Sequence, residues 1–83
     1  MKNYLIFSND EIFLKEKKFS SNSNDTVNII ESINKKFKIF LFFKNSKKKF
    51  SFYKKLQNKI IRLDYQKILN LKKQKNLKIF MIS

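Results

Sequence analysis

The chain has 83 residues, among them 19 Lys, 11 Ile, 10 Asn and 10 Phe, and its formal net charge is +14. Gly, Pro, Ala, Cys, His and Trp are absent, which excludes glycine-rich phosphate loops, disulfides, zinc fingers and cysteine or histidine catalysis. The abundant residue types have AT-rich codons, so the composition is typical of an AT-rich bacterial genome. Because only six carboxylates are present, we expect neither a self-contained enzyme nor a bound cofactor or metal.

The first half of the chain predicts a strand, a helix and a second strand. Asn3–Ser8 is an almost continuous apolar run, which favours a strand buried on both faces. Residues 9–23 are mostly polar and are expected to form a loop or a single helical turn. Apolar residues then recur at helical spacing after the N-capping types at 23–25, which predicts a helix over 25–36. Residues 37–43 are aromatic and apolar and predict the strongest strand.

The second half predicts further short elements. Residues 48–57 are ambiguous and form a possible helix, because a weak apolar stripe runs through them. Residues 59–63 are predicted as a strand. Asp64 is then expected to cap a helix over 65–74, and Asn76 to take the left-handed conformation that glycine usually takes after a helix.

A last strand is predicted over 77–82, one residue before the end of the sequence. The segments between predicted strands are a dozen residues or longer, as parallel crossovers require, and no glycine-containing hairpin turn is present. We therefore predict one α/β domain: a four-stranded parallel sheet in the order 3-2-1-4 with two or three helices, an incomplete doubly wound Rossmann-like domain. The last strand would be a poorly covered edge, so we expect residues 1–83 to be the start of a larger domain.

Several segments resemble the start of a GT-B-type glycosyltransferase. They are the opening Met1–Asp10, the helical segment Ser23–Lys36, the strand Phe37–Phe43 and the ending Leu77–Ser83. The resemblance implies a truncated, acceptor-side portion of a Rossmann-like domain that is inactive alone. In a full-length protein it implies transfer of sugar from a nucleotide sugar to a glycan acceptor. No catalytic residue of the family can be placed on this sequence.

The predicted parallel sheet also suggests where a substrate would bind. Ligands of such sheets lie beyond the carboxyl ends of the strands, close to helix N-termini that present free N–H groups. The candidate substrate-binding residues are Ser8, Asn9, Asp10, Asn22, Ser23, Asn24 and Ser83. The alternative is that the polar residues before the helix only cap it and that Asp10 is a solvated loop carboxylate.

Charge is distributed unevenly along the chain. Residues 1–31 carry a net charge of −1 and residues 32–83 a net charge of +15. The densest stretch contains no acid and is the candidate anion-binding patch: Lys44, Lys47, Lys48, Lys49, Lys54, Lys55 and Lys59. The positive electrostatic field of such a cluster of lysines attracts polyanions. A small basic module that binds nucleic acid or an anionic membrane surface is therefore the second functional hypothesis, and a solvated lysine surface produced by codon bias is the alternative.

Two further expectations concern location and partners. The longest apolar run, residues 39–43, is far shorter than the ~20 residues that span a membrane. The apolar run at residues 4–7 is too short for the core of a signal peptide, so we expect a cytoplasmic protein. A third hypothesis is that the uncovered strand 77–82 pairs with a strand of a partner protein.

Overall fold

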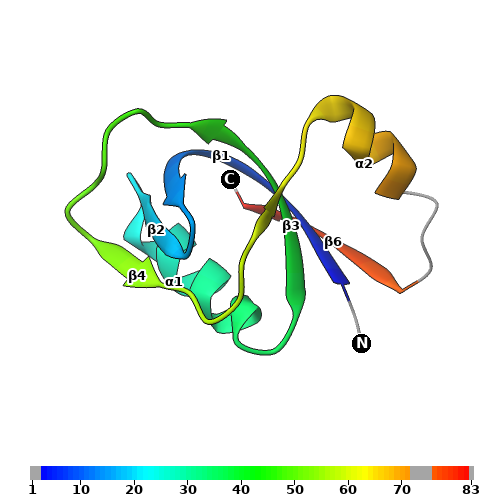
Figure 1. The fold of residues 1–83 in the computed structure, drawn as a ribbon, viewed down its shortest axis with the longest axis horizontal. Coiled ribbons are helices and arrows are strands. Elements are labelled where there is room, and N and C mark those ends of the chain that lie inside the picture. The colour runs from blue at the N-terminus through cyan, green and yellow to red at the C-terminus, as the bar shows by residue number, and fades with distance from the viewer. Residues whose placement is uncertain (1–2, 72–75, 83) are drawn as a thin grey trace.

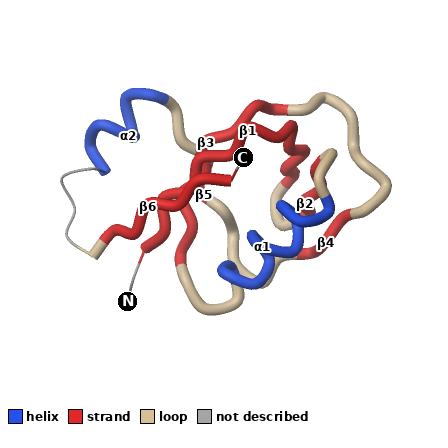
Figure 2. The backbone as a smooth tube through the Cα atoms, turned by 180° about the vertical axis from the view of Figure 1, so that it is seen from behind, coloured by secondary structure: helices blue, strands red, loops and turns tan. Residues whose placement is uncertain are grey.

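The computed structural model describes residues 3–71 and 76–82 and contains a six-stranded mixed sheet with two helices. The elements in chain order are β1 (Asn3–Lys15), β2 (Lys18–Ser21), α1 (Asn24–Asn34), β3 (Lys38–Asn45), β4 (Tyr53–Lys55), β5 (Ile61–Arg62), α2 (Tyr65–Leu71) and β6 (Leu77–Ile82). Helix α1 lies beside β2 and β4, and α2 lies at the opposite end of the molecule (Figure 1). Figure 2 shows the same separation of the two helices from behind.

Strand β1 organises the sheet. One of its edges pairs in parallel with β3 from Asn3 to Ile12. Its other edge is shared: residues 3–8 pair in parallel with β6, and residues 12–15 pair antiparallel with β2. The β1–β3 register shifts between Phe7 and Glu11, an irregularity of the kind that bends a strand. The bend separates the part of β1 that pairs with β6 from the part that pairs with β2.

The predicted fold class is wrong. A purely parallel, four-stranded Rossmann-like sheet was expected, whereas the sheet has six strands, and two of its pairings, β1 with β2 and β2 with β4, are antiparallel. The strands β5, β3, β1 and β6 do lie side by side in parallel. They form one part of a mixed sheet, because β1 continues seven residues beyond the predicted end at Ser8 and then turns back.

The expected loop at residues 9–23 is instead the second half of β1 followed by β2. The hairpin turn was missed because it contains no glycine: Glu16 takes a left-handed backbone with φ of 57°, in a turn closed by the pair Lys15 and Lys18. A positive φ at the first of two central turn residues is ordinarily a glycine feature. Burial compensates for this unfavourable conformation, because Ile12 and Phe19 on the two strands are fully buried.

The prediction of a possible helix over residues 48–57 is also wrong. The segment contains β4, whose residues pair with β2, and Leu56 next to it is buried in the core. The strand predicted at 59–63 is shorter, only Ile61–Arg62. The conformation of this segment is set by its long-range pairing with β2. The apolar pattern within the segment gives no information about that pairing.

The remaining elements agree more closely with the predictions. Helix α1 begins at Asn24 after the N-cap Ser23, and the strand predicted at 37–43 is observed at Lys38–Asn45. Asp64 caps α2 by accepting a hydrogen bond from the Lys67 backbone N–H at 2.9 Å. The predicted end of this helix, residues 72–74, lies outside the described residues. Strand 77–82 is confirmed.

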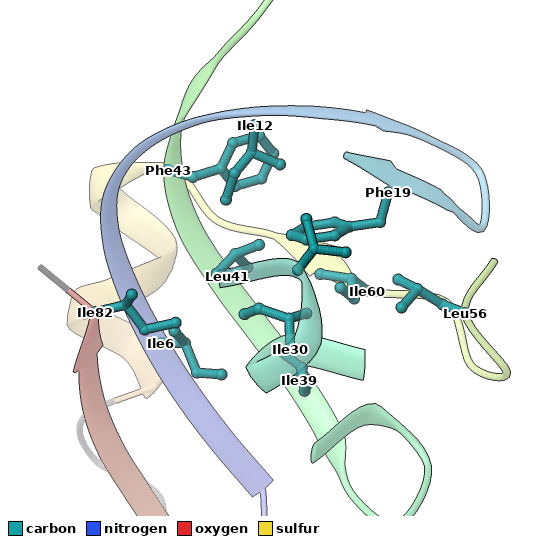
Figure 3. Close-up of a cluster of buried hydrophobic side chains, with 11 residues drawn as sticks. Ile6, Ile12, Phe19, Ile30, Ile39, Leu41, Phe43, Leu56, Ile60 and Ile82 are labelled. Atoms are coloured by element: carbon teal, nitrogen blue, oxygen red, sulfur yellow. The ribbon is translucent and has the colours of Figure 1, made fainter. Parts of the chain in front are cut away.

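The hydrophobic core has two parts, one on each face of the sheet. Residues alternate between faces along β3, so Leu41 packs in the cluster that α1 covers and Phe40 in the cluster that α2 covers. The larger cluster brings together side chains from β1, β2, β3 and α1 (Figure 3). Phe19 of β2 lies fully buried within it. The β1–β2 hairpin is thereby fixed to the rest of the domain.

Strand β6 is poorly covered, as predicted. It pairs with β1, and its side chains Ile79, Phe80 and Met81 are 56%, 40% and 74% exposed. The expected left-handed backbone of Asn76 is confirmed by its φ of 67°. The pairing of this strand with a partner protein stays a prediction.

A pair of asparagines joins the end of α1 to the segment between β4 and β5. The buried Asn34 side chain donates to the Asn58 carbonyl at 2.9 Å and accepts from the Asn58 backbone N–H at 3.0 Å. The Asn58 side chain donates to the Asn34 carbonyl at 2.8 Å. These bonds fix the backbone directly before Lys59.

We expect Asn34→Ala to lower the free energy of unfolding by about 1–3 kcal/mol, because two polar backbone groups of Asn58 lose their partners. Urea denaturation measures the change. Asn28→Ala on the exposed face of the same helix is the matched control and should change stability by less than about 0.5 kcal/mol. Equal losses in the two variants would contradict the role assigned to the asparagine pair.

Candidate functional site

The predicted substrate-binding residues converge only in part, near the start of α1. Ser8 is buried, and its hydroxyl accepts a hydrogen bond from the Asp10 backbone N–H at 3.2 Å. Thr26 in the first turn of α1 donates to the Asp10 carboxylate, and the Ser23 hydroxyl accepts from the Thr26 backbone N–H at 3.4 Å. The bend in β1 and the start of α1 therefore meet.

These groups use much of their hydrogen-bonding capacity on one another. Ser23 acts as the N-cap of α1, and the Asp10 carboxylate already places a negative charge at the positive end of the helix. A second anion would be repelled by Asp10. Asn9, Asn22 and Asn24 are exposed nearby in the sequence, and Ser83 lies outside the described residues. The substrate-site prediction stays a prediction, and the local geometry favours capping.

A different surface concentrates positive charge. A hollow of about 700 Å³ lies where the β1–β2 turn meets the segment that follows β4. Its lining contains five lysines and one acid: Lys15, Lys17, Lys18, Lys55, Lys59 and Glu16. We call this feature the lysine hollow. All six lining side chains are exposed.

Strand pairing explains how these lysines meet. Lys18 of β2 lies directly opposite Lys55 of β4 in the antiparallel pair, where like charges repel each other. The tight turn at Glu16 places Lys15 beside Lys18. A neighbouring hollow of about 450 Å³ shares Lys59 and adds three more lysines: Lys35, Lys36 and Lys38. Positive potential therefore extends over both hollows.

Carboxylates compensate this charge only weakly. The ion pairs found among the described residues join Lys44 to Glu11 at 3.6 Å and join Lys35 and Lys54 to Glu31 at 3.9 and 3.8 Å. No lysine of the lysine hollow takes part in an ion pair with any carboxylate that the structure describes. Concentrated, unpaired positive charge in a concave surface attracts anions and raises their local concentration.

The predicted anion-binding patch is divided by the fold. Lys55 and Lys59 line the lysine hollow, whereas Lys44 and Lys54 approach carboxylates. Lys47, Lys48 and Lys49 lie in the connection between β3 and β4. Only two of the seven predicted lysines thus line the lysine hollow. Its other three, from the β1–β2 turn, were missed because they are adjacent to Lys55 only through the pairing of β2 with β4.

Aromatic side chains accompany the positive charge. Tyr53 of β4 is 48% exposed, and the Lys49 ammonium lies 4.2 Å from the centroid of its ring. Tyr53 and Lys55 are two residues apart on β4, so their side chains share a face of the strand. Lys54 between them points to the opposite face, where it approaches Glu31 of α1. A half-exposed aromatic ring therefore lies beside the lysine hollow.

The comparisons with known proteins assign no family. No protein-family model matches the chain, and searches of curated proteins and of solved structures also find no match. The resemblance to GT-B-type glycosyltransferases stays a prediction. The mixed sheet removes the parallel Rossmann-like architecture on which its structural expectation depended.

Proposed function

We propose that this protein is a nucleic-acid-binding module that contacts the phosphate backbone through the lysine hollow. The observation that carries the proposal is that five exposed lysines and a single acid line one concave surface. Lysine ammonium groups that neutralise phosphates release condensed counterions, which supplies the main part of sequence-independent affinity for nucleic acid. The net charge of +14 adds long-range attraction.

Nucleic acid is favoured over an anionic membrane surface by the position of the exposed apolar residues. A peripheral membrane module needs apolar side chains next to its basic residues. The most exposed large apolar side chains, Ile79 and Met81, lie on β6, and no β6 residue lines the lysine hollow. Tyr53, the exposed ring beside the hollow, carries a polar hydroxyl group. Neither described helix is long and apolar enough to cross a membrane.

The proposal predicts salt-sensitive binding. Fluorescence anisotropy should detect binding of a labelled oligonucleotide at low salt, with log K falling linearly with log salt. For five phosphate contacts on a single strand the slope should be about −3.5, since each contact contributes about −0.7. Absence of binding to both single-stranded and duplex oligonucleotides at low salt would overturn the proposal. Binding to anionic vesicles but not to nucleic acid would also overturn it.

A further inference from the structure

The surface beside the lysine hollow contains an aromatic group suited to an unpaired base. Tyr53 lies on β4, which pairs with β2 at one end of the strand order. Its ring is 48% exposed. An exposed aromatic ring at the border of a basic surface is the arrangement by which proteins hold single strands, where bases stack on rings and lysines follow the phosphates.

The strand register places the ring and the charges on one face. Ser20 and Tyr53 are opposite each other across β2 and β4, as are Lys18 and Lys55. Opposed residues of an antiparallel pair share a face, and so do residues two apart along a strand. Tyr53, Lys18 and Lys55 therefore point to the same side of the β2–β4 pair. One nucleotide unit can thus place its base on the ring and its phosphate toward a lysine.

Lys49 helps to orient the ring and covers one of its faces, so a stacking base takes the opposite face. Its ammonium lies 4.2 Å from the ring centroid of Tyr53, within the range of a cation–π interaction. The backbone before Tyr53 is also anchored, because the Phe50 N–H donates to the buried Ser20 hydroxyl at 3.2 Å. An ordered ring loses less conformational freedom when a base stacks on it.

From these observations we propose that the ligand is single-stranded nucleic acid and that one base stacks on Tyr53. This inference rests on the proposed function, because the lysines supply the phosphate contacts. In a duplex each base is already stacked and paired, so its face is not accessible to the ring without unpairing. A single strand presents base faces directly.

The test combines two variants with two ligands. Tyr53→Ala should weaken binding of a short single-stranded oligonucleotide by about 5- to 150-fold, the loss expected for one stacked base. Tyr53→Phe should keep affinity within about twofold, because the ring remains. For an abasic strand of the same length and charge, Tyr53→Ala should leave affinity unchanged. Circular dichroism and thermal melting of the variants check that they fold.

The outcomes separate the inference from the proposed function. Unchanged affinity of Tyr53→Ala for the oligonucleotide, an equal loss for the abasic strand, or tighter binding of duplex than of single strand by the wild-type protein would overturn the stacking inference alone. Failure of the wild-type protein to bind the oligonucleotide, the abasic strand and the duplex at low salt would overturn the proposed function as well.

Discussion

Phe19→Ala is expected to lower the free energy of unfolding by about 3–5 kcal/mol, the range for removing a buried aromatic side chain. Phe19 is fully buried on β2 and belongs to the larger core cluster, with Ile30 of α1 and with Leu56 and Ile60 beyond β4 (Figure 3). A domain of this length has a total stability of only about 4–12 kcal/mol. The variant should therefore lose a large fraction of its stability, which chemical denaturation measures as a lower midpoint and a thermal melt as a lower Tm.

Phe80→Ala is the matched control, because it removes the same side chain from a site that is 40% exposed on β6. This variant should lower the free energy of unfolding by about 1 kcal/mol or less. Similar losses for the two variants would contradict the described core. If Phe19→Ala were no less stable than wild type, the β1–β2 hairpin could not be fixed to the core as described, and the position of the lysine hollow would lose its support.

The largest effect on binding is expected from removing charge in the lysine hollow. The triple variant Lys18→Gln, Lys55→Gln and Lys59→Gln should make the salt-dependence slope about 2 smaller in magnitude, because three phosphate contacts are lost. At about 0.1 M salt this corresponds to roughly a 100-fold weaker affinity for a single-stranded oligonucleotide. Anisotropy titrations at several salt concentrations measure both quantities. The replaced side chains are exposed, so the fold should be retained.

A second triple variant controls for net charge. Lys44→Gln, Lys67→Gln and Lys78→Gln lower the charge by the same amount, and none of these lysines lines the lysine hollow or the hollow next to it. The control should weaken binding by less than about tenfold, through the long-range field alone. Equal effects of the two triple variants would mean that nucleic acid binds to a diffuse positive surface. The assignment of the binding site to the lysine hollow would then be wrong.

The elements that the sequence predicted well are those determined by local pattern. Helix α1 follows from its apolar spacing and the N-cap Ser23, and β3 from its run of aromatic and apolar residues. Strand β6 has the predicted bounds. In each case the residues that fix the element lie within it or directly before it, so periodicity and capping are sufficient.

The predicted topology was wrong because the observed one depends on the β1–β2 turn and on the pairing of β2 with β4, and both have only weak signals in the local sequence. Glu16 takes the conformation expected of glycine, in a chain that has no glycine, so the usual sign of a hairpin was absent. Ile12 and Phe19 are part of the signal that remained, since they are two of the four apolar residues in a mostly polar segment, with Phe13 and Leu14. The burial of Ile12 and Phe19 supports the hairpin against the cost of the turn.

The candidate site was predictable only as a tendency toward positive charge. The local density of lysines along the sequence indicated an anion-binding patch from Lys44 to Lys59. The fold, however, places Lys44 beside Glu11 and brings Lys59 next to the lysines of the β1–β2 turn. Lysines distant in sequence become neighbours through the pairing of β2 with β4. A one-dimensional charge count contains no information about that pairing.

Mapping the bound oligonucleotide by NMR tests the central claim most directly. Backbone amide shifts would be followed while a short single-stranded oligonucleotide is added at low salt. The largest changes should occur at residues 15–18 and 53–59, the β1–β2 turn and the segment from β4 to Lys59. Changes centred on α2 or β6, or small changes spread evenly over every lysine, would contradict the assignment of the lysine hollow as the binding site.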